Sequence, residues 1–380
     1  MMLIRQLREN EAHKSAALMA AAFGFNTNID EKREEKLDEE FWGAFDDDGE
    51  TLMAQIAAKD YRSYLGGKAL GTLGIAGVST LPEYRRNGCI RAVFARLFQM
   101  APERGWALSM LYPFSYEYYR KFGYERICDK VSLALPIRQL SAIKRDGSGI
   151  LCVEKAQGEL LRGIYDRTAR RFNGMLVRTD NSAWSFSPYG SGAYTYLFMQ
   201  NDVPCACATY RVSGNTLVIS SIYCDVFEDM ERIVGFARNY DGQVQNVRFE
   251  GLTELAPALT MMLGEERGFS FDVCGGPMAR VLDVPAALEA CADPDASVTL
   301  LVRDDQIAEN NGTFTLAGGH CERADGRTPE LECDIRALTL LAYGAYDRTP
   351  EEWRYYGVNV YSADALAAFP RRRIRLDDAF

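Results

Sequence analysis

Three arginines surround a glycine at the start of an apolar repeat, in the stretch YRRNGCIRAVF that covers residues 84–94. Arg85 and Arg86 precede Gly88, and Arg91 follows it. Guanidinium groups donate forked hydrogen bonds to phosphate oxygens, and glycine has no Cβ to keep a phosphate away from the backbone. These residue types indicate a binding site for a polyanion, although the formal net charge of the chain is −10.

The surrounding pattern predicts a strand, a tight loop and a helix, which together would position the arginines. Residues 78–80 close an apolar strand, and Pro82 can neither continue that strand nor donate to it. Apolar residues then recur at the spacing of one helix face, namely Ile90, Val93, Phe94, Leu97 and Phe98. The unpaired amide groups and the positive dipole end of such a helix attract an anion. The alternative is an exposed basic cap on a core helix.

A second R-x-x-G match, Arg171 to Gly174, lies in a different context. It follows a predicted helix instead of opening one, so the helix dipole would point the wrong way for an anion. The context, and not the short motif, therefore distinguishes the stretch around Gly88.

Proton transfer in this chain must use groups other than histidine, because only His13 and His320 are present. This scarcity argues against Ser-His-Asp and Cys-His mechanisms. A zinc site could use His320 and Cys321, but no further ligands follow at a usual spacing, so we expect no metal. A tyrosine, with a pKa of about 10, is protonated at neutral pH and can donate to a thiolate with a pKa of about 8.5. Residues 115–125, SYEYYRKFGYE, hold several such donors, for which packing in the core is the alternative.

The bulk composition limits the class of protein. The chain has 380 residues, 47% of them hydrophobic and 25% charged, which is typical of a globular protein with two or three domains. Its ten cysteines include no C-x-x-C pair, so we expect reduced thiols. Without a signal peptide or an apolar span, the chain is predicted to be cytoplasmic and not membrane-bound. A sequence pI of about 5.0 disfavours nucleic acid as a partner.

Strand and helix patterns alternate along the chain, which predicts an α/β or α+β fold. Near the N-terminus we expect a helix from Asn10 to Phe23, a second, charged helix over 29–45, and a hairpin turn at Gly66 and Gly67. A later set of elements loosely repeats the order of the first, which indicates a duplicated fold. The predicted segments are 1–137, 138–281 and 282–380.

Two spaced motifs carry a family resemblance. The pattern V-x-x-x-P-x-x-R-R-x-G-x-[LI]-R begins at Val78, and Y-x-x-F-G-Y covers residues 119–124. Together they resemble the enhanced intracellular survival N-acetyltransferases of the GNAT superfamily. The acyl-CoA motif of that superfamily is [QR]-x-x-G-x-[GA]. Arg85 and Gly88 match it, whereas Ile90 departs from the usual small last residue.

The resemblance implies tandem GNAT folds, the N-terminal one active and the central one degenerate, followed by a sterol-carrier-like α+β domain. The run VLDVPAALEA, residues 281–290, looks like the entry into that third domain. In the central segment, the stretch that corresponds to the arginine-glycine loop contains Asp225, Glu228 and Asp229 and no early glycine. These carboxylates would repel phosphates, so we expect one acetyl-CoA site per chain. The resemblance also implies a homohexamer.

Site residues follow from the resemblance, position by position. The backbone of Val78, Ser79 and Thr80 would pair with the pantetheine arm. The pyrophosphate would bind to Arg85, Arg86, Asn87, Gly88, Cys89, Ile90 and Arg91. Phe114 and Ser115 would line the acetyl end.

The same resemblance assigns the two proton-transfer groups. Tyr119 would be the general acid, with Tyr118 and Tyr116 as neighbouring rivals. The α-carboxylate of Phe380 would be the general base, for which a solvated, frayed end is the alternative. Asp377 and Asp378 beside it would favour a cationic amine.

The expected function is an acetyl-CoA-dependent N-acetyltransferase acting on a small cationic amine or a protein lysine. Aminoglycosides and polyamines fit this description, and the resemblance favours aminoglycosides. The alternatives are a longer acyl donor, or a non-catalytic lipid-carrier or interaction protein with a vestigial GNAT fold.

Overall fold

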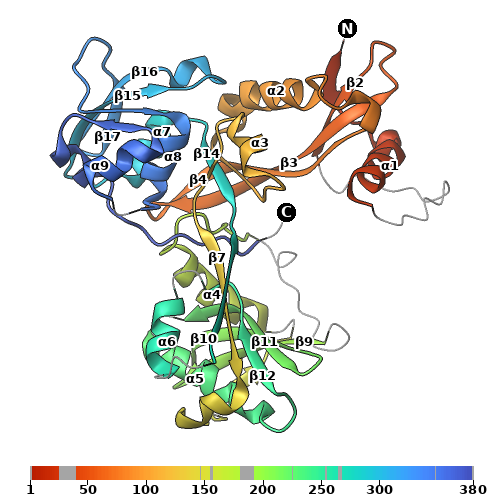
Figure 1. Ribbon diagram of the computed structural model, residues 1–380, viewed down its shortest axis with the longest axis vertical. Helices are drawn as coiled ribbons and strands as arrows, with labels where there is room; N and C mark the ends of the chain where they lie inside the picture. The colour runs from red at the N-terminus through yellow and green to blue at the C-terminus, as the bar shows by residue number, and fades with distance from the viewer. Residues whose placement is uncertain are drawn as a thin grey trace.

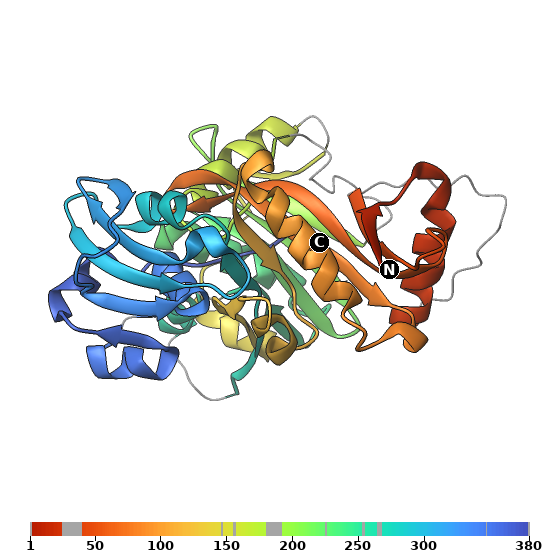
Figure 2. The same cartoon turned by 90° about the horizontal axis from the view of Figure 1, so that it is seen from above.

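The computed structural model shows three lobes, each built on one β-sheet (Figure 1). The first and third sheets lie side by side, and the second lies beyond a narrow waist (Figures 1 and 2). The residues described are 2–24, 40–145, 147–154, 157–179, 192–224, 226–252, 255–263, 268–346 and 348–378.

The first sheet has seven strands and carries the arginine-glycine loop. In spatial order the strands are β1 (Leu3–Gln6), β2 (Glu40–Phe45), β3 (Leu52–Leu65), β4 (Lys68–Thr80), β5 (Trp106–Leu111), β14 (Met278–Val281) and β6 (Glu125–Arg126). Its helices are α1 (Ala12–Phe23), α2 (Cys89–Arg104) and α3 (Tyr116–Arg120). Gly24 ends α1 at a φ of 69°, as the sequence predicts, and Gly66 and Gly67 join β3 to β4.

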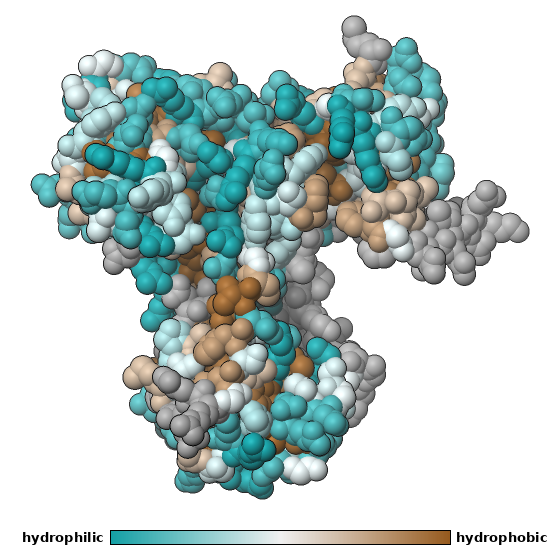
Figure 3. Space-filling model, in the orientation of Figure 1, coloured by the Kyte–Doolittle hydropathy of each residue, from teal (hydrophilic) through white to brown (hydrophobic). Residues whose placement is uncertain are grey.

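The second sheet also has seven strands. In spatial order they are β13 (Ser270–Gly275), β7 (Asp129–Pro136), β12 (Asn246–Phe249), β11 (Thr216–Cys224), β10 (Val203–Ser213), β9 (Ala193–Gln200) and β8 (Ile150–Cys152). Its helices are α4 (Gly158–Ala169), α5 (Phe227–Ala237) and α6 (Ala256–Leu263). The edge strand β13 is exposed along its length and includes the exposed side chains of Phe271 and Val273. Figure 3 shows hydrophobic surface at the waist.

The third sheet has five strands and packs against the first lobe. They are β17 (His320–Arg323), β16 (Gly312–Ala317), β15 (Ser297–Arg303), β18 (Leu331–Asp334) and β19 (Val358–Val360). The helices of this lobe are α7 (Val284–Cys291), α8 (Ile335–Tyr343) and α9 (Pro350–Trp353). One hydrophobic core joins residues of β5 and β14 to this lobe, so the two lobes share an interior.

The first two sheets repeat one pattern of strand pairing, which supports the predicted duplication. The first sheet is read from β1 and the second from β8. Each then has three antiparallel pairings, one parallel pairing and two antiparallel pairings. The sheets also exchange strands. β7 follows the first lobe in sequence but pairs in the second sheet, whereas β14 follows the second lobe but pairs in the first. The mixed α/β fold is confirmed, and the exact boundaries at 137 and 281 stay a prediction.

One local prediction was wrong. The sequence suggested a helix over 29–45, but residues 40–45 form β2, which pairs with β1 and β3. Trp42, Ala44 and Phe45 are buried in this sheet. Their burial and the pairing on both sides outweigh the helical preference of the charged run before them. Residues 25–39 lie outside the described part of the chain.

Candidate active site

A fork between two parallel strands forms the centre of the candidate site. β4 and β5 pair from Gly71 and Trp106 as far as Ile75 and Leu111. β4 then continues to Thr80, paired only with β3, past an irregularity at which Gly77 has a φ of 54°. Within the described residues, no strand pairs with the other edge of 76–80. That edge offers backbone groups to an extended ligand, as an open sheet edge does.

The loop after β4 leads into the open N-terminus of α2. Gly88 is the N-cap residue with a φ of 80°, a conformation that L-residues other than Asn and Asp seldom adopt. No side chain caps the helix, and a Cβ at Gly88 would have no atom within 4 Å. The first amide groups of a helix have no intrahelical acceptor, so they point outward here. The apolar face predicted from Ile90 to Phe98 is buried, which confirms that face of the helix.

A cavity of about 830 Å³ lies at this fork. It is lined by all of the predicted donor-site residues except Asn87 and Ser115. Asn87 is exposed beside the cavity, and Ser115 caps α3 by accepting a hydrogen bond from the amide of Tyr118 at 3.3 Å. The structure thus brings residues of β4, the loop, α2 and the segment after β5 together around one space. Their part in binding stays a prediction.

Some lining residues were not predicted as donor-site residues, although Tyr118 was named as a rival general acid. They are Ala22, Phe23, Tyr84, Tyr118, Lys121 and Phe122. Tyr118, Lys121 and Phe122 lie in or beside the Y-x-x-F-G-Y motif, so their proximity to Tyr119 in sequence could have indicated them. Ala22 and Phe23 end α1, and only the tertiary fold places them here. Phe114 and Phe23 are 68% and 47% exposed, so the cavity presents aromatic surface to a ligand.

Among the described residues, the lining of this cavity has four cationic side chains and no acidic one. They are Arg85, Arg86, Arg91 and Lys121. In the part of the chain that the structure describes, none of them forms an ion pair. Unneutralised charge at an open helix N-terminus is an arrangement that favours a phosphorylated ligand.

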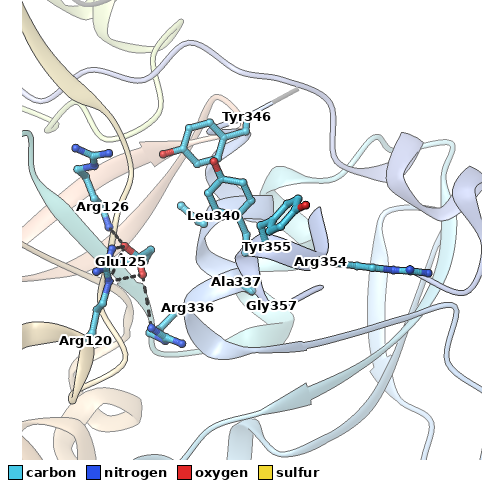
Figure 4. Close-up of a pocket in the computed structure, with 11 residues that line it drawn as sticks. Arg120, Glu125, Arg126, Arg336, Ala337, Leu340, Tyr346, Arg354, Tyr355 and Gly357 are labelled. Atoms are coloured by element: carbon cyan, nitrogen blue, oxygen red, sulfur yellow. Dashed lines mark hydrogen bonds and ion pairs between the residues drawn. The ribbon is translucent and has the colours of Figure 1, made fainter. Parts of the chain in front are cut away.

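A second basic cavity, of about 520 Å³, provides a contrast (Figure 4). It lies between α3 and α8, and Glu125 is part of its lining. Glu125 lies 2.6 Å from Arg120 and 3.8 Å from Arg336. Figure 4 shows Arg354 extending away from this group. Because Glu125 offsets the charge of its neighbours, this cavity lacks the uncompensated charge of the fork.

Tyr119 is buried next to the fork, on α3. It is 3% exposed, and its ring contacts those of Phe114 and Tyr118 at centroid distances of 5.3 and 5.2 Å. Burial raises the pKa of Tyr119, with smaller contributions from Tyr118 and Tyr124. The phenol therefore stays protonated, as a proton donor must. It lies behind Phe114 and Tyr118, which line the cavity themselves.

The two rival tyrosines have different surroundings. Tyr118 lines the cavity, and burial raises its pKa. The Tyr116 hydroxyl donates to the carbonyl of Gly276 at 3.0 Å, so its proton is engaged with the connection between β13 and β14. Position favours Tyr118 or Tyr119 over Tyr116 as a donor to a ligand in the fork.

The C-terminal tail crosses to the end of β5. The Tyr112 hydroxyl, just after β5, donates to the carbonyl of Leu376 at 2.9 Å. Asp378 forms an ion pair with Arg178 at 2.6 Å. Phe380, the predicted general base, lies outside the described residues.

The second lobe has its own fork, between β11 and β12, and Arg375 of the tail contacts it. Ser221 of β11 has a φ of 49°, which corresponds to Gly77 of β4. Arg375, buried, donates to the carbonyl of Ile222 at 2.7 Å. The helix that follows, α5, has Glu228 and Asp229 in its first turn. Phosphate would meet carboxylates there, as the sequence indicated.

The described residues offer neither a metal site nor a membrane-spanning helix. No group of three or more His, Cys, Asp or Glu residues in these ranges could hold a metal ion. His320 lies 2.8 Å from Glu289 instead. Among the helices assigned to the described residues, none is long and apolar enough to cross a membrane.

Comparison with known proteins agrees with this architecture. Residues 3–127 match the acetyltransferase (GNAT) domain family, and residues 284–353 match the sterol carrier protein domain family. A sequence comparison with curated proteins finds no match.

Several solved structures share the fold over the full length of both chains. A conserved protein of Enterococcus faecalis, described as a probable N-acyltransferase, has 22% identity and a TM-score of 0.84. A GCN5-related N-acetyltransferase from Anabaena variabilis has 22% identity and a TM-score of 0.81. Eis1 from Mycobacterium abscessus has 20% identity and a TM-score of 0.81. Residues 3–127 are therefore an acetyltransferase domain of the GNAT family, and residues 284–353 are a sterol carrier protein domain.

Proposed function

We propose that this protein transfers the acetyl group of acetyl-CoA directly to an amine of a cationic molecule. The observation that carries the proposal is the cavity at the fork of β4 and β5, whose described lining has four cations and no acid, beside an open helix N-terminus. Coenzyme A has the features that such a cavity would select, namely a pyrophosphate and an extended pantetheine arm with amide groups.

Each part of the donor has a proposed partner. The open edge of Val78, Ser79 and Thr80 supports backbone pairing with the pantetheine arm. Arg85, Arg86 and Arg91, with the amides from Asn87 to Ile90, hold the pyrophosphate. Phe114 and Ser115, where β5 ends, contact the acetyl end.

In the proposed reaction, the amine nitrogen attacks the acetyl carbonyl carbon and the C–S bond breaks. The Tyr119 phenol gives its proton to the departing sulfur, and a base takes the proton from the amine. Burial keeps the phenol protonated by raising its pKa. A thiolate released among the same aromatic rings is also destabilised as an anion, so its basicity rises toward that of the phenol.

The α-carboxylate of Phe380 is the proposed base. The contact of Leu376 with Tyr112 supports it, because it holds the tail at the end of β5, four residues before Phe380. An α-carboxylate is ionised at neutral pH, with a pKa of about 3.3–3.7, and would act through water or as the C–N bond forms.

The acceptor is proposed to be cationic, with aminoglycosides, polyamines and lysine side chains as candidates. Asp377 and Asp378 do not supply free negative charge, because Arg375 and Arg178 pair with them at 2.8 and 2.6 Å. The net charge of −10 is the remaining support for a cationic acceptor. The cytoplasmic location and the hexamer remain predictions of the same proposal.

The proposal is tested by measuring thiol release from acetyl-CoA with an aminoglycoside, a polyamine and a lysine peptide. We expect at least one amine to accelerate release, and mass spectrometry to find that amine heavier by one acetyl group. If acetyl-CoA fails to bind and no amine accelerates release, a non-catalytic carrier protein becomes the better description.

Extending the chain after Phe380 tests the base. A Gly-Ser-Gly extension moves the α-carboxylate away, so kcat should fall about tenfold or more, with acetyl-CoA binding unchanged. The control is the same extension before Met1, which should keep full activity. Full turnover by the C-terminally extended protein would exclude the terminal carboxylate as the base.

A further inference from the structure

The sterol carrier protein domain reaches the first lobe through a buried ion pair. Arg280 of β14 donates two hydrogen bonds, of 2.8 and 2.6 Å, to the carboxylate of Asp304, which follows β15. Both side chains have 0% exposure. Removing two charges from water is costly, and an apolar pair of similar volume is often as stable. Stability alone therefore does not explain why two charged residues are buried at this position.

Asp304 is held rigidly within the third lobe. Its carboxylate also accepts from the backbone amides of Gln306 and Ile307 at 2.9 and 3.2 Å. The side-chain amide of Asn310 donates to it at 2.9 Å. Residues of the third lobe thus hold the Asp304 carboxylate in place, and its two hydrogen bonds orient the guanidinium group of Arg280.

Arg280 also contacts the turn that follows α3. Its other terminal nitrogen donates to the carbonyl of Phe122. The amide of Phe122 donates to the carbonyl of Tyr119 at 2.9 Å. Gly123, with a φ of 81°, leaves the space in which the guanidinium lies, because a Cβ there would collide with Arg280. The glycine of the Y-x-x-F-G-Y motif is thus required both by its backbone conformation and by this contact.

The same guanidinium also contacts α2. It lies over the ring of Phe98 at 4.5 Å, while its Nε is buried without a hydrogen-bond partner in the described chain. An unsatisfied buried donor is unfavourable, so the contact is not optimised for stability alone. Arg280 therefore joins α2, the turn after α3 and the third lobe at one point.

We infer that the sterol carrier protein domain positions Tyr119 through Asp304, Arg280 and the carbonyl of Phe122. Arg280 and Asp304 are positioning residues, since neither lines the cavity at the fork. This inference rests on the proposed role of Tyr119 as the general acid. It gives the third lobe a task in acetyl transfer that needs no lipid ligand.

The first test replaces the buried pair with apolar residues, in the double variant Arg280→Met with Asp304→Leu. Such a replacement removes both charges together, so neither is left buried without its partner, and the fold is expected to survive. Displacement of the turn should lower kcat about 10- to 100-fold, with the KM for acetyl-CoA changed by less than about threefold. The single variant Asp304→Asn should lower kcat in the same direction, and circular dichroism and thermal unfolding report whether each protein is folded.

A double-mutant cycle separates positioning from a general structural effect. In a Tyr119→Phe background the apolar pair should lower kcat further by about twofold or less, because the group it positions is absent. The matched control is Glu125→Gln, which removes the exposed ion pairs of Arg120 and Arg336 at the same boundary (Figure 4). We expect that variant to keep nearly full kcat.

The outcomes are distinct. A folded Arg280→Met and Asp304→Leu protein with wild-type kcat would overturn the inference, as would an equal loss of kcat with and without the Tyr119 hydroxyl. If Tyr119→Phe alone leaves kcat unchanged, it is the assignment of the acid that fails.

Discussion

Replacing Tyr119 with phenylalanine should lower kcat about 100- to 1,000-fold, while the KM for acetyl-CoA stays within about threefold of the wild-type value. The substitution removes one hydroxyl and keeps the ring that packs against Phe94, Phe114 and Tyr124. In the described chain the hydroxyl makes no hydrogen bond that the fold would lose, so stability should change little. Steady-state kinetics with a saturating amine provide the measurement.

Tyr118→Phe and Tyr116→Phe are the matched controls, because they remove the same group from the same short helix. Both should retain kcat within about threefold, and Tyr116→Phe should cost some stability through its lost bond to Gly276. If Tyr118→Phe is the inactive variant, the acid is the tyrosine that lines the cavity.

The pH dependence of kcat provides a second check on Tyr119. The pKa of Tyr119 is raised, so its donor form persists as pH rises, and kcat should not fall between pH 7 and about 10 through loss of this proton.

The local parts of the site could be predicted from sequence because each rests on a short-range rule. Pro82 ends a strand, Gly88 permits the left-handed turn, and helical spacing predicts the buried face of α2. The anion site needs only these elements in this order. The tyrosine motif is similar, since α3 and its turn are formed by neighbours in sequence.

The parts that could not be predicted depend on pairing between distant segments. Nothing local to residues 129–136 or 278–281 indicates that each strand completes the other sheet. The same holds for 40–45, where burial between two strands decided against a helix. The surroundings of Tyr119 likewise depend on Arg280 and Asp304, which are far from it in sequence.

Duplication explains why one fork is open and the other is filled. Gly77 and Ser221 bend corresponding strands in the same way, so both sheets make a fork. In the first, an uncapped helix and cations face the space. In the second, Arg375 donates to Ile222, at the position that corresponds to Val78. A fork without an anion site could thus accept a guanidinium from the tail. The next residue, Leu376, accepts a hydrogen bond from Tyr112, just after β5.

The charge around Gly88 should dominate donor binding. Arg85→Ala and Arg91→Ala should each weaken acetyl-CoA binding about tenfold, since a hydrogen bond to a charged group contributes about 1.5–3 kcal/mol. Gly88→Ala should weaken it about 10- to 100-fold, because the left-handed conformation costs an alanine about 1–2 kcal/mol and a Cβ would enter the phosphate site. Titration calorimetry with acetyl-CoA measures each dissociation constant.

Arg96→Ala is the control, because Arg96 lies on the same helix, is exposed and does not line the cavity. It removes the same charge, so it tests whether location or net charge matters. Its binding should stay within about twofold of wild type at 0.15 M salt, where the Debye length is about 8 Å. Equal weakening by Arg85→Ala and Arg96→Ala would mean that general electrostatic attraction, and not a built phosphate site, holds the donor. Because the guanidinium groups of Arg85 and Arg91 have no ion-pair partner in the described chain, their removal leaves no carboxylate of those residues without its partner.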